Sequence, residues 1–180
     1  QEGCYYSKYE ARDLLKTFVK KFKGSDLDKK GVKVSMFESG SMEGDDSSCA
    51  AYMDCILGRG PKYVFKNAKL RKYFKEVSMH SYWSGADTKK NAEKYISDKY
   101  SKYSVAATEY CQMTDDKNTG VYDLIAKEKN GTNGTSIKYG VAMANTIVDD
   151  LTIMNANEWD WWTACSYGTY TDGLIYLDED

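Results

Sequence analysis

Residues 76–111, EVSMHSYWSGADTKKNAEKYISDKYSKYSVAATEYC, decide the fold class of this sequence. A strand is predicted over residues 76–83, a helix over 88–103 and a second strand over 105–111. The helix carries Ala92, Tyr95, Ile96, Lys99 and Tyr103 along one side, and the later strand is apolar at its start and polar at its end. Strands that alternate with helices are typical of a parallel sheet covered by helices.

The same alternation extends in both directions along the chain. The capping box Ser7-x-x-Glu10 predicts the start of a first helix, and Gly24 predicts its end. Further strands are predicted over 32–37, 159–165 and 173–177, and further helices over 47–57, 68–74, 121–129 and 137–154. The last of these helices is expected to carry an apolar stripe formed by Ile137, Val141, Ala144, Val148, Leu151 and Met154.

The composition excludes several classes of protein. The 180 residues carry 25 Lys and Arg against 27 Asp and Glu, and this balance argues against a nucleic-acid binder that works by neutralising phosphates. No apolar run approaches the roughly 20 residues of a membrane span. With one histidine and no C-x-x-C motif, the sequence argues against a metal site, and no cofactor is expected. Whether Cys49 and Cys55 form a disulfide stays open at this point.

The predicted strand ends carry carboxylates and aromatic rings. They are Phe37-Glu38-Ser39, His80-Ser81-Tyr82-Trp83, Thr108-Glu109-Tyr110 and Trp159-Asp160-Trp161-Trp162. Ligands meet parallel α/β folds at the carboxyl ends of strands, and sugars stack on aromatic planes while their hydroxyls pair with carboxylates. Each residue also has a structural explanation: an ion-paired Glu109, a hydrogen-bonded His80, core tryptophans, and Glu38 as a helix cap. Composition and spacing alone therefore favour a parallel α/β domain that binds carbohydrate.

Three motifs that close successive strands resemble glycoside hydrolase family 30, particularly its endo-β-1,6-galactanase-like members. They are His80-Ser-Tyr-Trp83, Ala107-Thr-Glu-Tyr-Cys111 and Asn157-Glu-Trp-Asp-Trp-Trp-Thr163. The resemblance covers nearly the whole chain and implies that Glu109 is the catalytic nucleophile. It implies that His80 and Tyr82 line the subsite of the cleaved sugar, and that Trp159 or Trp161 forms its aromatic wall. The further substrate-binding residues expected are Trp83, Tyr110 and Glu38.

The chain departs from the family pattern in its length and in its acid/base. A full barrel takes about 250 residues. The Asn-Glu-Pro motif of the family's acid/base is absent, because Pro61 is the only proline. We therefore predict the second half of a (β/α)8 TIM barrel over residues 1–166, made of helix 4 and strands 5–8. Residues 167–180 would be an exit segment that begins a β-sandwich strand.

The resemblance implies a retaining glycoside hydrolase that acts on a β-linked polysaccharide. In that mechanism Glu109 attacks the anomeric carbon, while a second carboxylic acid about 5–5.5 Å away protonates the leaving oxygen. Glu2 and Glu38 are the carboxylates that could replace the missing acid, although Glu38 fits better as a helix cap or subsite residue. The isolated chain is therefore expected to hydrolyse little or nothing.

Partners and location follow from the same interpretation. Open sheet edges invite association, so we expect pairing with the missing N-terminal half-barrel or with a second copy. A secreted or extracellular protein is expected, with a polysaccharide or oligosaccharide as substrate.

Two other classes stay open. A non-catalytic carbohydrate-binding protein would use the same aromatic strand ends without turnover. A flavodoxin-like domain would need a glycine-rich phosphate loop, and Gly40-Ser-Met-Glu-Gly44 follows the first predicted strand. The neighbouring Asp45 and Asp46 would repel phosphate, so this hypothesis ranks last.

Overall fold

A three-stranded parallel sheet lies at the centre of the molecule. The computed structural model describes residues 6–35, 38–42, 49–57, 72–112, 137–167 and 172–177. The sheet has the order β1 (Glu76–His80), β2 (Ser104–Glu109), β3 (Ala156–Trp159). Helix α5 (Ala86–Tyr100) separates β1 from β2 in the chain, and α7 (Ile137–Thr152) precedes β3. The alternation of helices with parallel strands is thus present, while the half-barrel stays a prediction because these sheets are small and open.

The segment before β1 runs alongside it without forming a regular strand. Isolated parallel bridges join Val34 to Phe74 and Ser39 to Met79, and the His80 N–H donates to the Ser39 carbonyl at 2.9 Å. A single bridge, at Val34, therefore represents the described part of the strand predicted over 32–37, of which residues 36 and 37 lie outside the described residues. Residues 68–71 of the helix predicted over 68–74 lie outside the described part, and the prediction is wrong at Phe74, which pairs with Val34 in a parallel bridge. The bridge at Ser39 brings Glu38 to the end of β1.

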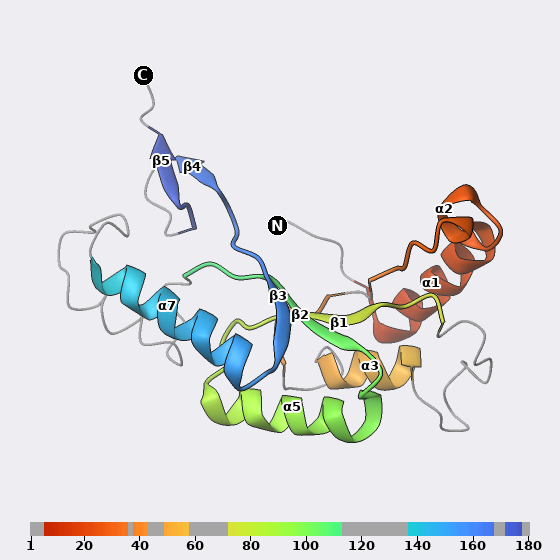
Figure 1. The fold of residues 1–180 in the computed structure, drawn as a ribbon, viewed down its shortest axis with the longest axis horizontal. Coiled ribbons are helices and arrows are strands. Elements are labelled where there is room, and N and C mark those ends of the chain that lie inside the picture. The colour runs from red at the N-terminus through yellow and green to blue at the C-terminus, as the bar shows by residue number, and fades with distance from the viewer. Residues whose placement is uncertain are drawn as a thin grey trace.

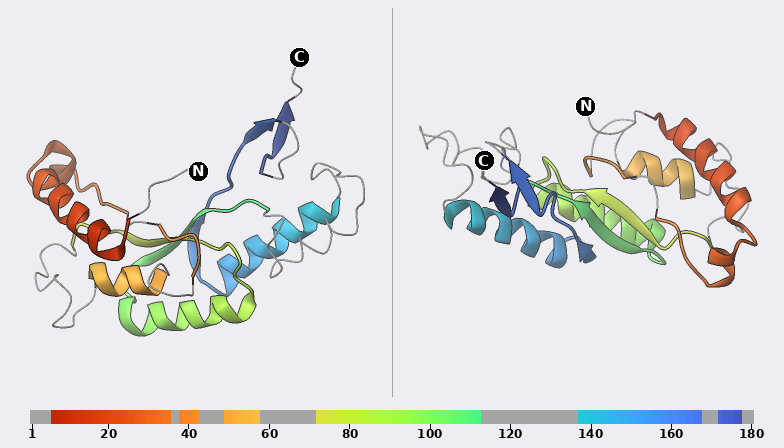
Figure 2. Two further views of the ribbon diagram at one scale, coloured as in Figure 1. Left: turned by 180° about the vertical axis from the view of Figure 1, so that it is seen from behind. Right: turned by 90° about the horizontal axis from the view of Figure 1, so that it is seen from above.

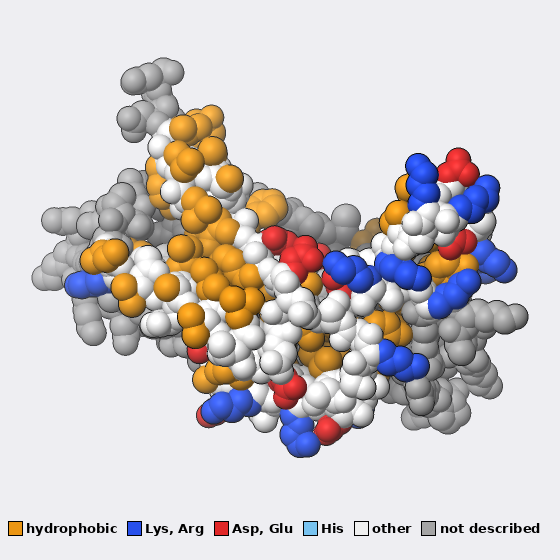
Figure 3. Space-filling view, viewed as in Figure 1, with side chains coloured by type: hydrophobic (Ala, Val, Ile, Leu, Met, Phe, Trp, Pro, Cys, Tyr) orange, Lys and Arg blue, Asp and Glu red, His pale blue; other side chains and the backbone are white. Residues whose placement is uncertain are grey.

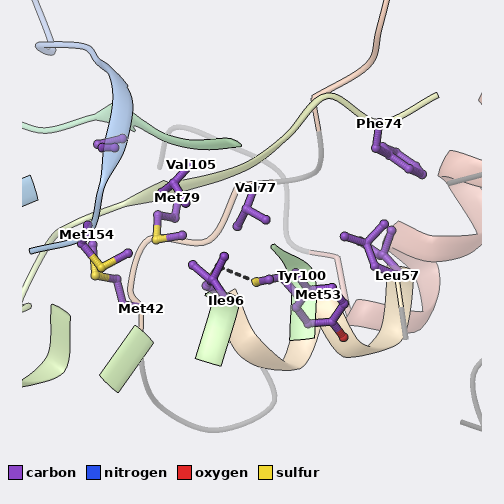
Figure 4. Close-up of a cluster of buried hydrophobic side chains, with 14 of the residues drawn as sticks. Met42, Met53, Leu57, Phe74, Val77, Met79, Ile96, Tyr100, Val105 and Met154 are labelled. Carbon is purple, nitrogen blue, oxygen red and sulfur yellow. Dashed lines mark hydrogen bonds between the residues drawn. The ribbon is translucent and has the colours of Figure 1, made fainter. Parts of the chain in front are cut away.

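Helices cover one side of the sheet. Figures 1 and 2 show α3 (Cys49–Leu57), α5 and α7 on the same side of the strands. The core between them combines Met53 and Leu57 of α3 with Ile96 of α5 and with Val77 of β1, as Figure 4 shows. This packed layer fixes the strands, and therefore fixes the residues at their carboxyl ends.

The first helix begins where its capping box predicts. In α1 (Lys8–Phe22) the Ser7 side chain accepts from the Glu10 N–H, and the Glu10 carboxylate accepts from the Ser7 N–H. Gly24 follows the helix with φ +82°, a conformation that favours glycine. Helix α1 packs against α3, and the short α2 (Asp26–Lys29) follows it.

Helix α7 turns a different face to the sheet from the one predicted. Its buried residues are Tyr139, Ala142, Thr146 and Asp150. Most of the predicted apolar stripe faces outward, and Ile137 is 81% exposed, whereas Met154 lies beyond the end of α7 and is buried in the core. The predicted inner face is wrong because the spacing of apolar residues carries no information about polar side chains that are buried through contacts with other segments. On the buried face, Asp150 forms an ion pair with Lys89 and accepts two further hydrogen bonds. The helix predicted over 121–129 lies outside the described residues.

The chain after β3 leaves the sheet. The strand predicted over 159–165 is divided, since β3 ends at Trp159 and β4 (Cys165–Tyr167) pairs in parallel with β5 (Ile175–Leu177). Residues 160–162 stay attached to the end of β2, because the Tyr110 N–H donates to the Asp160 carbonyl and the Trp162 N–H to the Tyr110 carbonyl. Figure 1 shows β4 and β5 projecting from the body of the molecule. Within the described ranges, no helix is both long enough and apolar enough to span a bilayer.

Candidate active site

The carboxyl ends of the three parallel strands bring the predicted site residues together. His80 ends β1 and Glu109 ends β2, and these two residues are direct partners in the ladder after a register shift. Trp159 ends β3 and is paired with Ala107. Parallel pairing therefore places an imidazole, a carboxylate and an indole at one edge, as proposed for ligand sites of such sheets.

Glu109 is held by a tyrosine hydroxyl and remains open to solvent. The Tyr82 hydroxyl donates to Glu109 Oε1 at 3.0 Å, and His80 Nδ1 lies 3.7 Å from the same oxygen. The Glu109 side chain is 29% exposed. A carboxylate whose orientation is fixed by one neighbour and which still reaches solvent is suited to nucleophilic attack.

Tyr82 donates to Glu109 as a neutral phenol. Its oxygen accepts a hydrogen bond from the Cys111 N–H at 3.1 Å, while its O–H donates a hydrogen bond to Glu109. Burial raises the pKa of Tyr82 far above its ordinary value, and the neighbouring Cys111 thiol and Glu109 carboxylate raise it further. The hydroxyl therefore keeps its proton at any pH at which the protein would work, and it orients the Glu109 carboxylate throughout that range.

His80 lies between two carboxylates. Its Nε2 is 2.8 Å from Glu38 Oε2, on the opposite side of the ring from Glu109. The hydrogen bond from His80 lowers the pKa of Glu38, against a smaller opposing effect of burial. Glu38 is therefore ionised at neutral pH, whereas a general acid must carry its proton there. This argues for Glu38 as a residue that orients His80 or binds substrate, and against Glu38 as the missing acid; Glu2 lies outside the described residues.

Aromatic rings surround this group of polar side chains. Tyr110 stacks on Tyr82 with ring centroids 5.5 Å apart, and Trp159 and Trp161 each lie 6.1 Å from Tyr110. Tyr110 is fully buried, so its ring supports the cluster and offers no face to a substrate. The half-buried Trp159 and Trp161 are both held through their indole N–H groups, by the Asp150 carboxylate and by the Asp172 carbonyl.

Exposed tryptophans lie at the border of the site. Trp83 is 42% exposed, has φ +53° and follows Tyr82, with 5.6 Å between the two ring centroids. Trp162, which the sequence interpretation did not select, is exposed to a similar degree. Figure 3 shows hydrophobic atoms gathered over α7, β3 and the β4–β5 pair, while charged atoms dominate α1 and α2. The exposed Trp83 ring therefore offers apolar surface next to Tyr82, the donor to Glu109.

The sequence interpretation missed the buried pair Lys89 and Asp150. Lys89 shares one face of α5 with the buried Ile96 and Tyr100, and Asp150 shares the buried face of α7. The helical spacing therefore placed both residues on buried faces, but this indication was overlooked because charged side chains are normally expected at the surface.

The described part of the chain contains neither a candidate metal site nor a disulfide bond. No group of three or more His, Cys, Asp or Glu side chains there could hold a metal ion. Cys49 and Cys55 are buried free thiols in α3, which answers the open question about a bond between them, and Cys111 is also buried and free.

Comparison with known proteins gives one family and one similar structure. The family model described as O-glycosyl hydrolase family 30 matches residues 1–176. The chain is also similar to the crystal structure of a conserved exported protein from Bacteroides fragilis, with a TM-score of 0.65 and 21% sequence identity. That match covers 92% of this chain and 34% of the other, so this chain spans about a third of its length. At this identity the likeness concerns the fold alone. No curated protein matches the sequence.

Proposed function

Because the chain belongs to O-glycosyl hydrolase family 30, we propose that it carries the nucleophile of a retaining glycoside hydrolase and that this nucleophile is Glu109. The observation that supports the proposal is the position of this side chain. It ends β2, is partly exposed, accepts a hydrogen bond from Tyr82 and lies beside His80. A carboxylate in such a setting is oriented and reachable, as a displacement at an anomeric carbon requires.

In the proposed first step the Glu109 carboxylate attacks the anomeric carbon of a β-linked sugar. The bond from that carbon to the leaving oxygen breaks, and a glycosyl ester forms on Glu109. In the second step water attacks the same carbon and releases the carboxylate. Through its bond to Oε1, the Tyr82 hydroxyl holds the carboxylate plane in place during both steps.

The acid that protonates the leaving oxygen does not come from Glu38 in this proposal. The His80 hydrogen bond lowers the pKa of Glu38, so this group is already ionised at neutral pH. We propose that the acid/base is supplied by protein outside this chain, and that the chain alone hydrolyses unactivated glycans little or not at all. The substrate proposed is a β-1,6-linked galactan.

A substrate whose leaving group needs no acid can test Glu109 directly. The 180-residue chain is incubated with 2,4-dinitrophenyl 2-deoxy-2-fluoro-β-D-galactoside, and its intact mass and peptides are measured. Dinitrophenolate leaves without protonation, and the fluorine slows hydrolysis of the ester, so one sugar is expected to accumulate on the peptide containing Glu109. The gluco epimer, run in parallel, reports on the preferred sugar.

Matched variants decide the result. Glu109→Gln is expected to take no label, while Glu38→Gln is expected to be labelled, because Glu38 is not the nucleophile. Absence of label from the wild-type chain with both epimers would overturn the nucleophile assignment. Label on any other carboxylate would overturn it as well.

A non-catalytic carbohydrate-binding protein is the second candidate, favoured by the exposed rings of Trp83 and Trp162. It would bind β-1,6-galacto-oligosaccharides with unchanged affinity after Glu109→Gln, and it would form no fluorosugar ester. The labelling experiment therefore separates the two functions.

Location and partners are proposed on the same basis. We propose secretion, which the exported character of the similar Bacteroides fragilis protein supports by analogy. We also propose that the chain associates with the rest of a longer catalytic domain, because β3 is an edge strand of its three-stranded sheet. Sedimentation of the chain as a monomer at high concentration would count against the alternative of self-association.

A further inference from the structure

A buried carboxylate lies behind the candidate active site, where α5 and α7 meet the sheet. Asp150 is 0% exposed, and its Oδ1 forms an ion pair with Lys89 Nζ at 2.9 Å. Its Oδ2 accepts hydrogen bonds from the Ser81 hydroxyl at 2.8 Å and from the Trp159 indole N–H at 2.9 Å. Four separate segments of the chain therefore meet at one carboxylate.

A gain in stability does not account for this arrangement. The Lys89 side chain is 2% exposed, so both charges have lost their water. Apolar side chains of similar volume commonly replace such a pair without loss of stability. A carboxylate differs from an apolar side chain because it requires its donors to lie in set directions.

Both of those donors lead to the proposed active site. Ser81 lies between His80 and Tyr82, whose side chains both approach the carboxylate of the proposed nucleophile. The Trp159 ring contacts Tyr110, which in turn stacks on Tyr82. A shift of the acceptor would therefore reach the nucleophile both through the backbone and through the rings.

We propose that Asp150, held in place by Lys89, is a positioning residue of this active site. It fixes the His80–Tyr82 segment through Ser81 and fixes the aromatic wall through Trp159, and it touches no substrate itself. The inference rests on the proposed function of Glu109 and adds to it a site element contributed by the two covering helices.

Two double variants isolate the acceptor from the charge. Lys89→Met with Asp150→Asn removes the ion pair but keeps an oxygen that Ser81 and Trp159 can reach. Lys89→Met with Asp150→Leu removes the same ion pair and the acceptor as well. Both are compared with wild type at a temperature where far-ultraviolet circular dichroism shows each of them folded.

The first measurement is the rate of labelling of Glu109 by the dinitrophenyl fluorogalactoside. The Asn variant is expected to stay within about threefold of wild type, while the Leu variant loses roughly 10- to 100-fold in the limiting rate through misplacement of the reacting groups. Equal rates for the two variants would overturn the proposal. So would a loss that appears only in the half-saturating concentration of the reagent.

The second measurement is near-ultraviolet circular dichroism, with Trp159→Phe as the reference for the signal of that ring. The Leu variant is expected to lose this signal and the Asn variant to keep it; retention in both overturns the proposal. If wild type takes no label, the proposed function fails, and the spectra still decide the positioning role. If the Leu variant does not fold, Ser81→Ala provides the test: slower labelling with an intact Trp159 signal supports the proposal, and an unchanged rate overturns it.

Discussion

Removing only the negative charge of Asp150 is expected to destabilise the protein strongly. The single variant Asp150→Asn leaves the Lys89 ammonium buried without its carboxylate. Breaking a buried ion pair at one partner costs about 3–5 kcal/mol, because the remaining charge has neither water nor a counter-charge. The entropy of unfolding is about 2.1 cal/mol/K per residue, so the 180 residues give roughly 0.4 kcal/mol/K. The expected fall in melting temperature is then roughly 8–13 °C.

Urea unfolding followed by circular dichroism measures this loss as a free energy, at constant pH and with the slope compared between variants. The matched control is Asp149→Asn, which removes the same charge from the neighbouring, half-buried position of α7. That control is expected to change the free energy of unfolding by about 0.5 kcal/mol or less. Lys89→Met combined with Asp150→Asn is expected to recover most of the loss, because no charge is then buried.

A loss of less than about 1 kcal/mol for Asp150→Asn would refute this reasoning. It would mean that the Lys89 ammonium finds solvent or another partner once the carboxylate is gone. Equal losses for Asp149→Asn and Asp150→Asn would refute it too, because the effect would then come from the net charge of the helix.

Three further predictions concern other parts of the chain. The pKa of Glu38 is held below its ordinary 4.5 by the hydrogen bond from His80, so the stability from this contact is present above that pH and is lost as the pH falls through the folded-state pKa. In a carboxyl NMR titration, His80→Phe, which removes the donor, should move the midpoint of Glu38 upward, and an unmoved midpoint would contradict the assigned cause. Ser7→Ala should lower the free energy of unfolding by about 1 kcal/mol in urea, because α1 loses its N-cap acceptor; no change would show that the cap is not formed in solution. Ellman's reagent should react with the exposed Cys165 in the native protein and leave Cys49 unmodified, because burial shields that thiol and raises its pKa to about 12; mass mapping that finds Cys49 modified first would disprove the assigned burial.

Local signals in the sequence predicted the elements that local chemistry determines. The capping box of α1 depends only on residues three apart, so its start at Lys8 was predictable. The existence of β1 and β2 was predictable from short segments, although the predicted strands over 76–83 and 105–111 extend past the observed ends at His80 and Glu109. Their order along the chain then placed both ends at one edge of the sheet.

Contacts between distant segments could not be predicted in the same way. The apolar stripe of α7 suggested the wrong inner face, since the contact that turns the helix is Asp150 with Lys89, 61 positions earlier in the sequence. The bond between Glu38 and His80 likewise depends on the bridge between Ser39 and Met79, which no periodicity indicates. The proximity of His80, Tyr82 and Glu109 was expected from the family resemblance, whereas the identity of the donor to Glu109 required coordinates.

The outward stripe of α7 has a practical consequence for handling this protein. The folded chain exposes a row of apolar side chains to solvent, formed by Ile137, Val141, Val148 and Leu151. Dyes such as ANS, which fluoresce when they bind exposed apolar surface, should therefore show increased fluorescence with the native protein before any heating. Melting curves recorded with such a dye would start from a high fluorescence baseline and show a reduced change on unfolding. The unfolding of this chain is therefore better followed by the intrinsic signal of its tryptophan and tyrosine residues.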